Sequence, residues 1–244
     1  MMVREVEIRE YKKVNLREGT LFIGIPISGV LNLMLANYYI RAFNLDSIAS
    51  INSDHFPPVT FIFKGKPKFP ARIHADEKLK FAVITAEFTP NPRLTRMLGK
   101  TICEWAEKND IHNVVSVEEL LVSNTSSELG VYGIGSTDEA RNALKDKGIN
   151  YFEYGMLVGL SAVILDECRW ANIDAYCLVA EISQREPSFK IVAKVLETIN
   201  KLFPNIALDP QPLLKEAEML ENQIKELKEK IKPIETQPSM LFYG

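Results

Sequence analysis

The sequence has few of the residues from which metal sites and reactive thiol sites are built. Its 244 residues include only three histidines and three cysteines, with no CxxC spacing: His55, His74, His112, Cys103, Cys168 and Cys177. Because the histidines are isolated from one another and from the cysteines, neither a zinc site nor a cysteine–histidine nucleophile is expected. The cysteines lie in apolar segments and are expected to be small core residues in a reducing compartment.

The sequence also lacks a basic excess and long apolar runs. Its net charge of -3 and isoelectric point near 5.8 leave no cationic surplus to hold a phosphate backbone, so nucleic acid is not an expected partner. The first residues mix charged with apolar side chains and contain no signal-peptide core, and the apolar stretches elsewhere are too short to span a membrane. We therefore expect a cytoplasmic protein without a membrane partner.

Nucleotide-binding fingerprints are absent as well. The segment 24–29 has neither the GxGxxG nor the GxxxxGK[ST] pattern, which favours a tight strand-to-helix turn over a phosphate cradle. The segment 132–137 is a second place where backbone N–H groups could face a ligand at a helix start. Asp138 and Glu139 occupy that first turn, however, and they favour capping over anion binding.

No arrangement of side chains indicates catalysis. Glu118 and Glu119 are sequence neighbours, and neighbouring side chains diverge on a strand or helix, so a shared acid–base site is not expected. The same holds for the pair at 166–167. Ser161 lies within an apolar segment rather than in a GxSxG turn. We predict no enzyme activity and no cofactor.

Strand-like and helical segments alternate along the first 210 residues. Short apolar runs bounded by turn residues predict strands at 20–25, 59–64, 80–87, 114–117, 130–135 and 175–182. Longer apolar-patterned segments predict helices at 30–43, 91–109, 136–147, 155–170 and 187–203. Ser136 and Glu139 are expected to form a capping box for the third helix. The alternation predicts one α/β domain over residues 1–210, with a mostly parallel central sheet flanked by helices.

The last 34 residues have a different pattern. From 211 to 232, apolar residues alternate at spacings of four and three, which is the heptad pattern of one helical seam: Leu213, Ala217, Leu220, Ile224, Leu227 and Ile231. Pro212 suits a helix start, and Pro233 ends the segment. The seam is expected either to pack on the α/β domain or to pair with another subunit. Residues 233–244 form a proline-marked tail that ends in Phe242, Tyr243 and Gly244.

Several short motifs follow one another in an informative order. They are Gly24-Ile-Pro-Ile-Ser-Gly29 before an apolar helix, Phe56-Pro57-Pro58, the segment 155–167, and Cys177-Leu-Val-Ala-Glu181 leading into Glu186-Pro187. Together they resemble the PAC2 family, which comprises archaeal homologues of the proteasome assembly chaperones. The resemblance covers approximately residues 18–231. Two departures, Ile27-Ser28-Gly29 at the usual glycine-rich turn and Ser188-Phe189 after the acidic–proline pair, weaken any small-molecule role.

The resemblance implies an α/β fold related in outline to nucleoside phosphorylases, and it implies self-assembly, for example into a ring-shaped tetramer or pentamer. In members with a tyrosine-bearing ending it also implies binding to the proteasome core particle. The ending Leu241-Phe-Tyr-Gly244 is similar to the hydrophobic–tyrosine–any-residue ending of proteins that dock between neighbouring subunits of a core ring. An aromatic side chain, a phenol and a terminal carboxylate together suit such a pocket.

Three functions remain open at this point. The first is an ATP-independent protein that binds the proteasome core particle through its tail, as an assembly chaperone or an activator. In the second, the tail packs on its own oligomer and the protein binds a PAC2 paralogue. The third is an enzyme acting on nucleoside-like ligands near 24–29 and 133–135.

Overall fold

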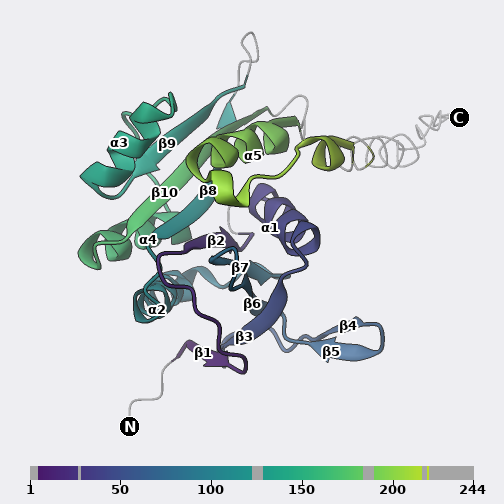
Figure 1. Ribbon diagram of the computed structural model, residues 1–244. Coiled ribbons are helices and arrows are strands. Elements are labelled where there is room, and N and C mark those ends of the chain that lie inside the picture. Colours follow the sequence, from purple (N-terminus) through teal and green to yellow (C-terminus); the bar gives the residue numbers. More distant parts are fainter. Residues whose placement is uncertain (1–4, 27–28, 123–128, 184–189, 216–218, 220–244) are drawn as a thin grey trace, which may run out of the picture.

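An eight-stranded sheet forms the centre of the molecule, and helices cover both of its faces (Figure 1). The computed structural model describes residues 5–26, 29–122, 129–183, 190–215 and 219. The strand order is β1-β3-β6-β7-β2-β8-β10-β9. The strands are β1 (Glu7–Glu10), β2 (Thr20–Gly24), β3 (Asp46–Asn52), β6 (Ala71–Asp76), β7 (Phe81–Ala86), β8 (Asn113–Val122), β9 (Val131–Gly135) and β10 (Asp174–Ser183). The predicted α/β layering is confirmed.

The sheet is parallel in its centre and antiparallel at its sides. Strands β7, β2, β8 and β10 run parallel to one another, whereas β1, β3 and β6 on one side and β9 on the other are antiparallel to their neighbours. The expectation of a mostly parallel sheet therefore holds for the centre, and the whole sheet is mixed. The short link from β6 to β7 explains part of this arrangement, because a tight turn can join only antiparallel strands.

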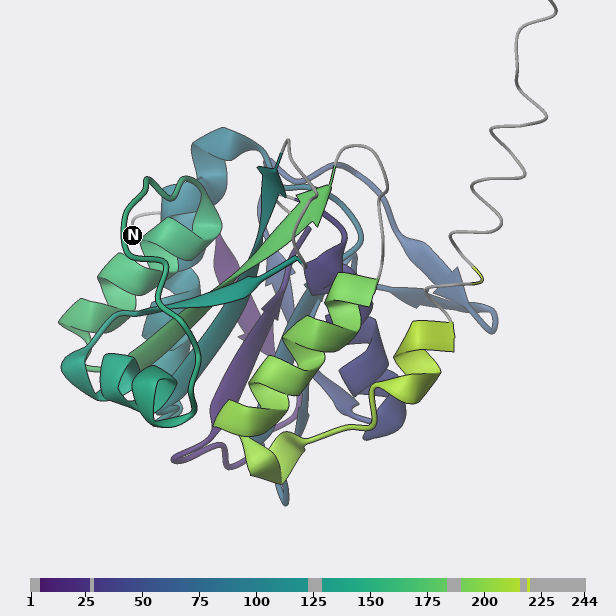
Figure 2. The ribbon, with the colours of Figure 1, turned by 90° about the horizontal axis from the view of Figure 1, so that it is seen from above.

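Between residues 29 and 202, the described parts of the chain form five α-helices, which lie on the two faces of the sheet (Figure 2). They are α1 (Leu31–Ala42), α2 (Thr95–Lys108), α3 (Asp138–Asp146), α4 (Leu160–Trp170) and α5 (Lys190–Leu202). Helices α2 and α4 pack into one hydrophobic core, and α1, α3 and α5 pack into the other. The central strands are buried by both layers, which is why their sequences read as continuous apolar runs.

Two predicted helix starts were wrong. The helix expected over 155–170 begins only at Leu160, because Gly159 has a φ of 99°, a left-handed conformation that ends any helical path before it. In α3, the Thr137 hydroxyl rather than that of Ser136 caps the helix and accepts from the Ala140 N–H at 3.0 Å. Ser136 instead bridges to β10, donating to the Ile173 carbonyl and accepting from the Ala175 N–H.

A two-stranded hairpin projects from one side of the body (Figure 1). It consists of β4 (Phe61–Phe63) and β5 (Lys66–Lys68), joined through Lys64 and Gly65, which both have positive φ angles. We refer to residues 59–69 as the arm. The predicted strand at 59–64 is confirmed in its central residues, but the pairing strand β5 was not predicted.

Residues 208–215, which follow α5, pack back against the α/β domain. Residues 211–215 are helical, and Leu213 is 1% exposed within the core formed with α1 and α5. The Tyr38 hydroxyl donates to the Asp209 carbonyl at 2.6 Å and fixes this return. The remaining seam positions 217, 220, 224, 227 and 231, and the tail residues 241–244, lie outside the described residues. Of the helices in the described ranges, none is both long and apolar enough to cross a membrane.

Candidate functional site

The carboxyl ends of the parallel strands are the first place to look for a site, because open α/β sheets bind ligands at this edge. Here β8 carries Glu118 and Glu119 close to the turn 24–29, which connects β2 to α1. The two side chains lie on opposite faces of the sheet. Each of them bonds near the start of a different helix.

Glu119 occupies the position at the start of α1 that an anion would need. Its Oε1 atom accepts from the Leu31 N–H at 2.9 Å, and a β-carbon added at Gly29 would lie 1.9 Å from the Glu119 carboxylate. Burial raises the pKa of Glu119, and the N–H groups of Leu31 and Val30 oppose that rise. The start of α1 thus already binds an internal carboxylate, and an external phosphate there would meet a like charge.

Glu118 is bound on the opposite face. The Ser161 hydroxyl, in the first turn of α4, donates to Glu118 Oε1 at 2.6 Å, and both side chains are buried. Cys177 lies nearby, and burial, followed by the Glu118 charge, raises the pKa of its thiol to about 12. Such a thiol stays protonated at neutral pH and is a poor nucleophile. Glu118 and Ser161 therefore join β8 to α4 and do not form an exposed acid–base pair.

The second glycine-containing segment also binds its own side chains. Arg141 donates to the Gly135 carbonyl at 3.0 Å and pairs with Asp138, while Thr137 caps α3. A cavity of about 410 Å³ opens beside Gly133 and Gly135. In the described part of the chain, no group of three or more His, Cys, Asp or Glu side chains is placed to hold a metal ion.

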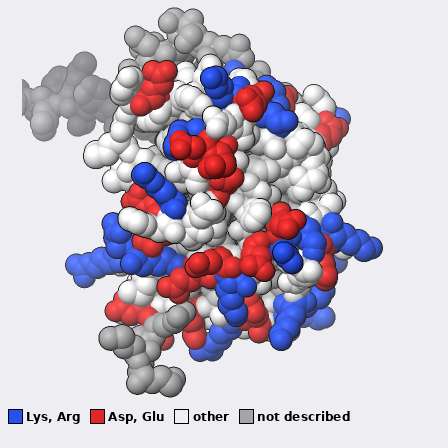
Figure 3. Space-filling view, turned by 60° about the vertical axis from the view of Figure 1, so that its left-hand side comes forward, with Lys and Arg blue, Asp and Glu red and all other residues white. Residues whose placement is uncertain are grey.

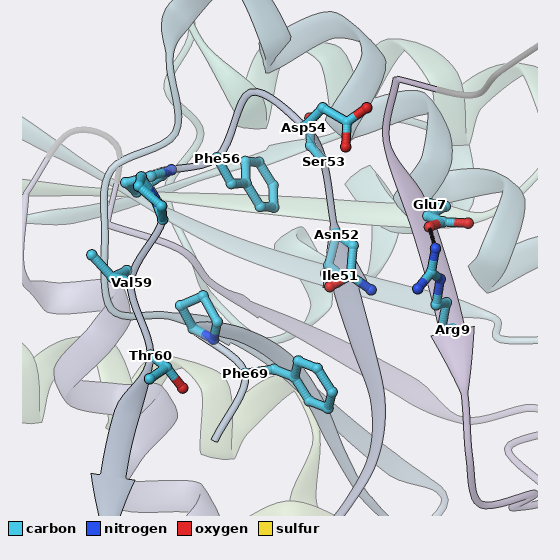
Figure 4. Close-up of a pocket in the computed structure, with 13 residues that line it drawn as sticks. Glu7, Arg9, Ile51, Asn52, Ser53, Asp54, Phe56, Val59, Thr60 and Phe69 are labelled. Carbon is cyan, nitrogen blue, oxygen red and sulfur yellow. Dashed lines mark ion pairs between the residues drawn. The ribbon is translucent and has the colours of Figure 1, made fainter. Parts of the chain in front are cut away.

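A larger cavity lies at the base of the arm (Figure 4). Its volume is about 870 Å³, and we refer to it as the base pocket. Its apolar wall consists of Ile51, Phe56, Pro57, Pro58, Val59, Phe69 and Pro70. The polar side is formed by Glu7, Arg9, Asn52, Ser53, Asp54 and Thr60. Arg9 pairs with Glu7 on the same strand, β1, and because Asp54 adds a second carboxylate, the charged side of the pocket carries a net negative charge.

The base pocket has a rigid frame. Arg72, on β6, forms a bidentate pair with Glu87 and donates to the Phe69 carbonyl. Phe56 packs edge-on against Phe88, with ring centroids 4.8 Å apart. These contacts hold both sides of the arm's base, where residues 56–60 lead into the arm and residues 69–70 lead out of it.

Exposed apolar side chains are found on the arm, just before α4 and at the end of α4. The arm presents Phe61, Ile62 and Phe63, which are 40%, 65% and 55% exposed. The segment leading into α4 and the end of that helix present Tyr154, Met156, Val158 and Trp170, and we refer to these four as the α4 set. Trp170 and Tyr154 are each 89% exposed. Figure 3 shows that uncharged atoms cover wide areas between the charged side chains on one side of the molecule. Apolar exposure of this kind marks protein-binding surfaces.

Of the sequence-predicted site residues, only Leu213 lies within the described part of the chain, where it is buried in the body. Sequence reasoning missed both the arm and the base pocket. A signal for the arm was present, because Lys64-Gly65 separates a β-branched and aromatic run from an alternating lysine run. The base pocket had no comparable signal, since its walls come from segments that meet only in the folded chain.

Comparison with known proteins gives consistent results. A family model described as PAC2 family matches residues 22–228. The chain is 26% identical over 228 residues to the uncharacterized protein MJ0106 of Methanocaldococcus jannaschii, and the alignment covers 93% of each chain.

Solved structures with the same fold include two from Pyrococcus furiosus. One is PbaA, described as an archaeal homolog of proteasome-assembly chaperone, with a TM-score of 0.80, 26% identity, and coverage of 92% of this chain and 97% of that chain. The other is PbaB, described as an archaeal proteasome activator, with a TM-score of 0.76, 15% identity, and coverage of 93% and 100%. At that identity the similarity to PbaB concerns the fold alone.

Proposed function

The chain belongs to the PAC2 family, and from this membership we propose that it is a proteasome assembly chaperone homologue that binds the proteasome core particle through its C-terminal tail. The observation that carries the proposal is the ending Leu241-Phe-Tyr-Gly244 on a chain that is similar to PbaA over 92% of its length. The proposed binding needs no ATP, since the sequence has no Walker motif.

The chemistry of the ending suits a pocket between two subunits. Phe242 offers an apolar side chain, the Tyr243 hydroxyl offers a hydrogen bond, and the Gly244 carboxylate offers a charge-assisted bond of about 1.5–3 kcal/mol to a cationic partner. The described chain returns to the body at Leu213 and ends at Met219. Residues 220–244 can reach at most about 80 Å from there, at about 3.3 Å per residue.

Self-association is part of the proposal, because a single tail of this kind binds weakly. Several tails on one assembly raise the overall avidity by about 10²–10⁴ when their spacing matches the pockets. The exposed apolar side chains of the arm and of the α4 set supply surface for contacts between copies. The family resemblance favours a ring-shaped tetramer or pentamer.

The test is co-sedimentation of the purified protein with purified archaeal core particles. Tyr243→Ala and deletion of residues 242–244 should each abolish binding, while Tyr151→Ala, which changes an exposed tyrosine outside the arm and the α4 set, should leave it intact. Binding that survives both tail changes would reject the tail mechanism. Hydrolysis of a short fluorogenic peptide by the mixture, without ATP, separates an activator from an assembly chaperone.

The small-molecule alternative has less support. Glu119 fills the anion position at the start of α1, and the Ser161 hydroxyl is bonded to Glu118. A thermal-shift screen with nucleosides and phosphate tests that alternative, and clear stabilisation by either would favour it over the binding function. A PAC2 paralogue as the partner, with the tail packed on its own oligomer, would instead appear as protection of the last ten residues from proteolysis.

A further inference from the structure

The arm is a surface feature that its own chain does not cover. Within the described ranges, its two strands pair with each other, and no other helix or strand packs substantially on either of them. A two-stranded hairpin alone in water is marginally stable, and exposed phenylalanine and isoleucine side chains add to that cost. The arm is therefore the kind of element whose exposed apolar side chains are covered by another molecule.

The strand register defines the chemistry of the partner. Phe61 lies opposite Lys68 and Phe63 opposite Lys66, so these four side chains share one face of the hairpin. The Lys68 Nζ atom lies 4.4 Å from the centre of the Phe63 ring. Residues 59–69 contain three lysines and no acidic residue. A matching surface must combine an apolar hollow with carboxylates beside it.

The base pocket has these properties. Its apolar wall includes Phe56, Pro57 and Phe69, and its charged side carries Glu7 and Asp54 against the single cation Arg9, which already pairs with Glu7. Its volume of about 870 Å³ is in the range of pockets that enclose ligands of several rings. The pocket's own arm leads away from it, because residues 56–60 and 69–70 form the pocket wall and continue outward as the hairpin (Figure 4).

We propose that two copies of this chain exchange their arms, so that the Phe61–Phe63 face of each hairpin fills the base pocket of the other. The arm and the pocket are adjacent in one chain, so a two-fold axis near the arm's base brings each arm over the pocket of its partner. Such a contact is isologous: the same surface serves both copies and the contact closes after two. Lys66 and Lys68 of one copy then face Glu7 and Asp54 of the other.

This interface specifies one contact of the self-association in the proposed function. Its biological role rests on that function, but the contact itself does not. It makes a pair of chains. A larger ring requires a second, independent contact, for which the α4 set is available, and rings built from such pairs have an even number of chains, so the arm exchange fits the tetramer and not the pentamer. The tail takes no part in the arm exchange, so the two mechanisms can be tested separately.

The experiment is sedimentation-velocity and light-scattering measurement of the full chain over a range of protein concentrations. Lys66→Glu and Asp54→Lys should each weaken the pair at least about tenfold in Kd, because each places like charges opposite one another. The double variant K66E/D54K should recover most of the loss, since the opposite charges then face each other with their positions reversed. Phe63→Asp should abolish the pair.

Trp170→Asp is the matched control, because it also places a charge on a highly exposed aromatic position but lies on α4, away from the arm. It should leave the two-chain contact unchanged. Circular dichroism and thermal melting show whether each variant folds. Should Phe63→Asp unfold the chain, the charge-swap pair still decides the question.

Two results would overturn the proposal: a wild-type chain that stays monomeric at all concentrations, or charge-swapped arms that associate like the wild type while Trp170→Asp does not. Deletion of residues 242–244 should leave the pair intact. In the converse test, a synthetic peptide of the last ten residues, which contains no arm, should compete with the full chain for core particles when present in excess. Failure of the arm exchange and failure of the tail mechanism therefore give different patterns.

Discussion

His74 provides the sharpest test of the packing around β6. Its side chain is 5% exposed, its Nε2 atom accepts from Arg72 Nε at 3.4 Å, and its Nδ1–H faces the Leu45 carbonyl at 3.4 Å. The acceptor role of Nε2 requires the neutral imidazole. Burial, and then the charge of Arg72, lower its pKa to about 4.

The sign of the pH effect follows from this depressed value. In the unfolded chain the imidazole takes up a proton near pH 6.5, whereas in the folded chain it does so only near pH 4. Between these values the unfolded state binds more protons, so the free energy of unfolding falls as the pH falls. The Leu45 carbonyl and Asp46 favour the charged form but do not offset the burial, which Arg72 and Lys68 reinforce.

The magnitude is measurable. A pKa difference between about 6.5 and about 4 corresponds to about 3 kcal/mol when fully expressed, of which about 2 kcal/mol is already lost at pH 5 relative to pH 8. His74→Gln keeps a donor and an acceptor but does not titrate. Urea unfolding at several pH values from 8 to 5 should show a shallower pH slope for this variant than for the wild type.

The exposed His112→Gln variant controls for the loss of a histidine as such. Parallel pH curves for the wild type and His74→Gln would refute the reasoning, because they would mean that the ring is already charged or solvated in the folded state. If the His112→Gln variant showed a shallower pH slope of the free energy of unfolding than the wild type, the pH effect would come from His112 and the reasoning about His74 would fail.

Three further predictions concern the core and the carboxyl edge of the sheet. Gly24→Ala should destabilise the fold by about 1–3 kcal/mol or more in urea unfolding, because the new β-carbon would lie 2.2 Å from Ala36 Cβ and 2.6 Å from the Ile84 carbonyl oxygen; an unchanged midpoint would mean that α1 does not pack this closely on β2. Ser161→Ala should cost about 1–3 kcal/mol, because buried Glu118 loses its hydroxyl donor, and Ser53→Ala, which changes a half-buried serine, should cost less. A thiol reagent should label none of the three buried cysteines until urea unfolds the chain, because the hydrogen bond with Cys103, and then burial, raise the pKa of Cys168, and burial raises that of Cys177; rapid labelling of the native protein would contradict the packing of α2 against α4.

The sequence was informative where local chemistry decides the structure. Strands β2, β7 and β10 are apolar on both faces because helices cover both sides, and such runs are visible without any tertiary information. The helix ends were harder to place. Gly155 and Gly159 both lie in the apolar segment before α4, and only the left-handed φ of Gly159 decides where the helix begins.

Charged residues hid two of the strands that the sequence analysis missed. Strands β1 and β6 contain charged residues, such as Arg9 and Arg72, at positions where a pattern-based prediction expects apolar ones. Arg72 is tolerated in the sheet because Glu87 and the Phe69 carbonyl lie within reach of its guanidinium group. That partner set exists only after β6 and β7 have paired, so the sequence of β6 alone does not reveal it.

The placement of polar groups at the carboxyl edge of the sheet favours the proposed binding function over the small-molecule alternative. In an open α/β sheet, a ligand at the carboxyl edge needs free backbone N–H groups at a helix start. Here Glu119 accepts a hydrogen bond from the Leu31 N–H, and Glu118 accepts one from the Ser161 hydroxyl on the other face of the sheet. Both donor groups therefore hold helices to the sheet. The exposed apolar side chains lie elsewhere, on the arm and in the α4 set. Exposed apolar surface of this kind suits recognition of another protein.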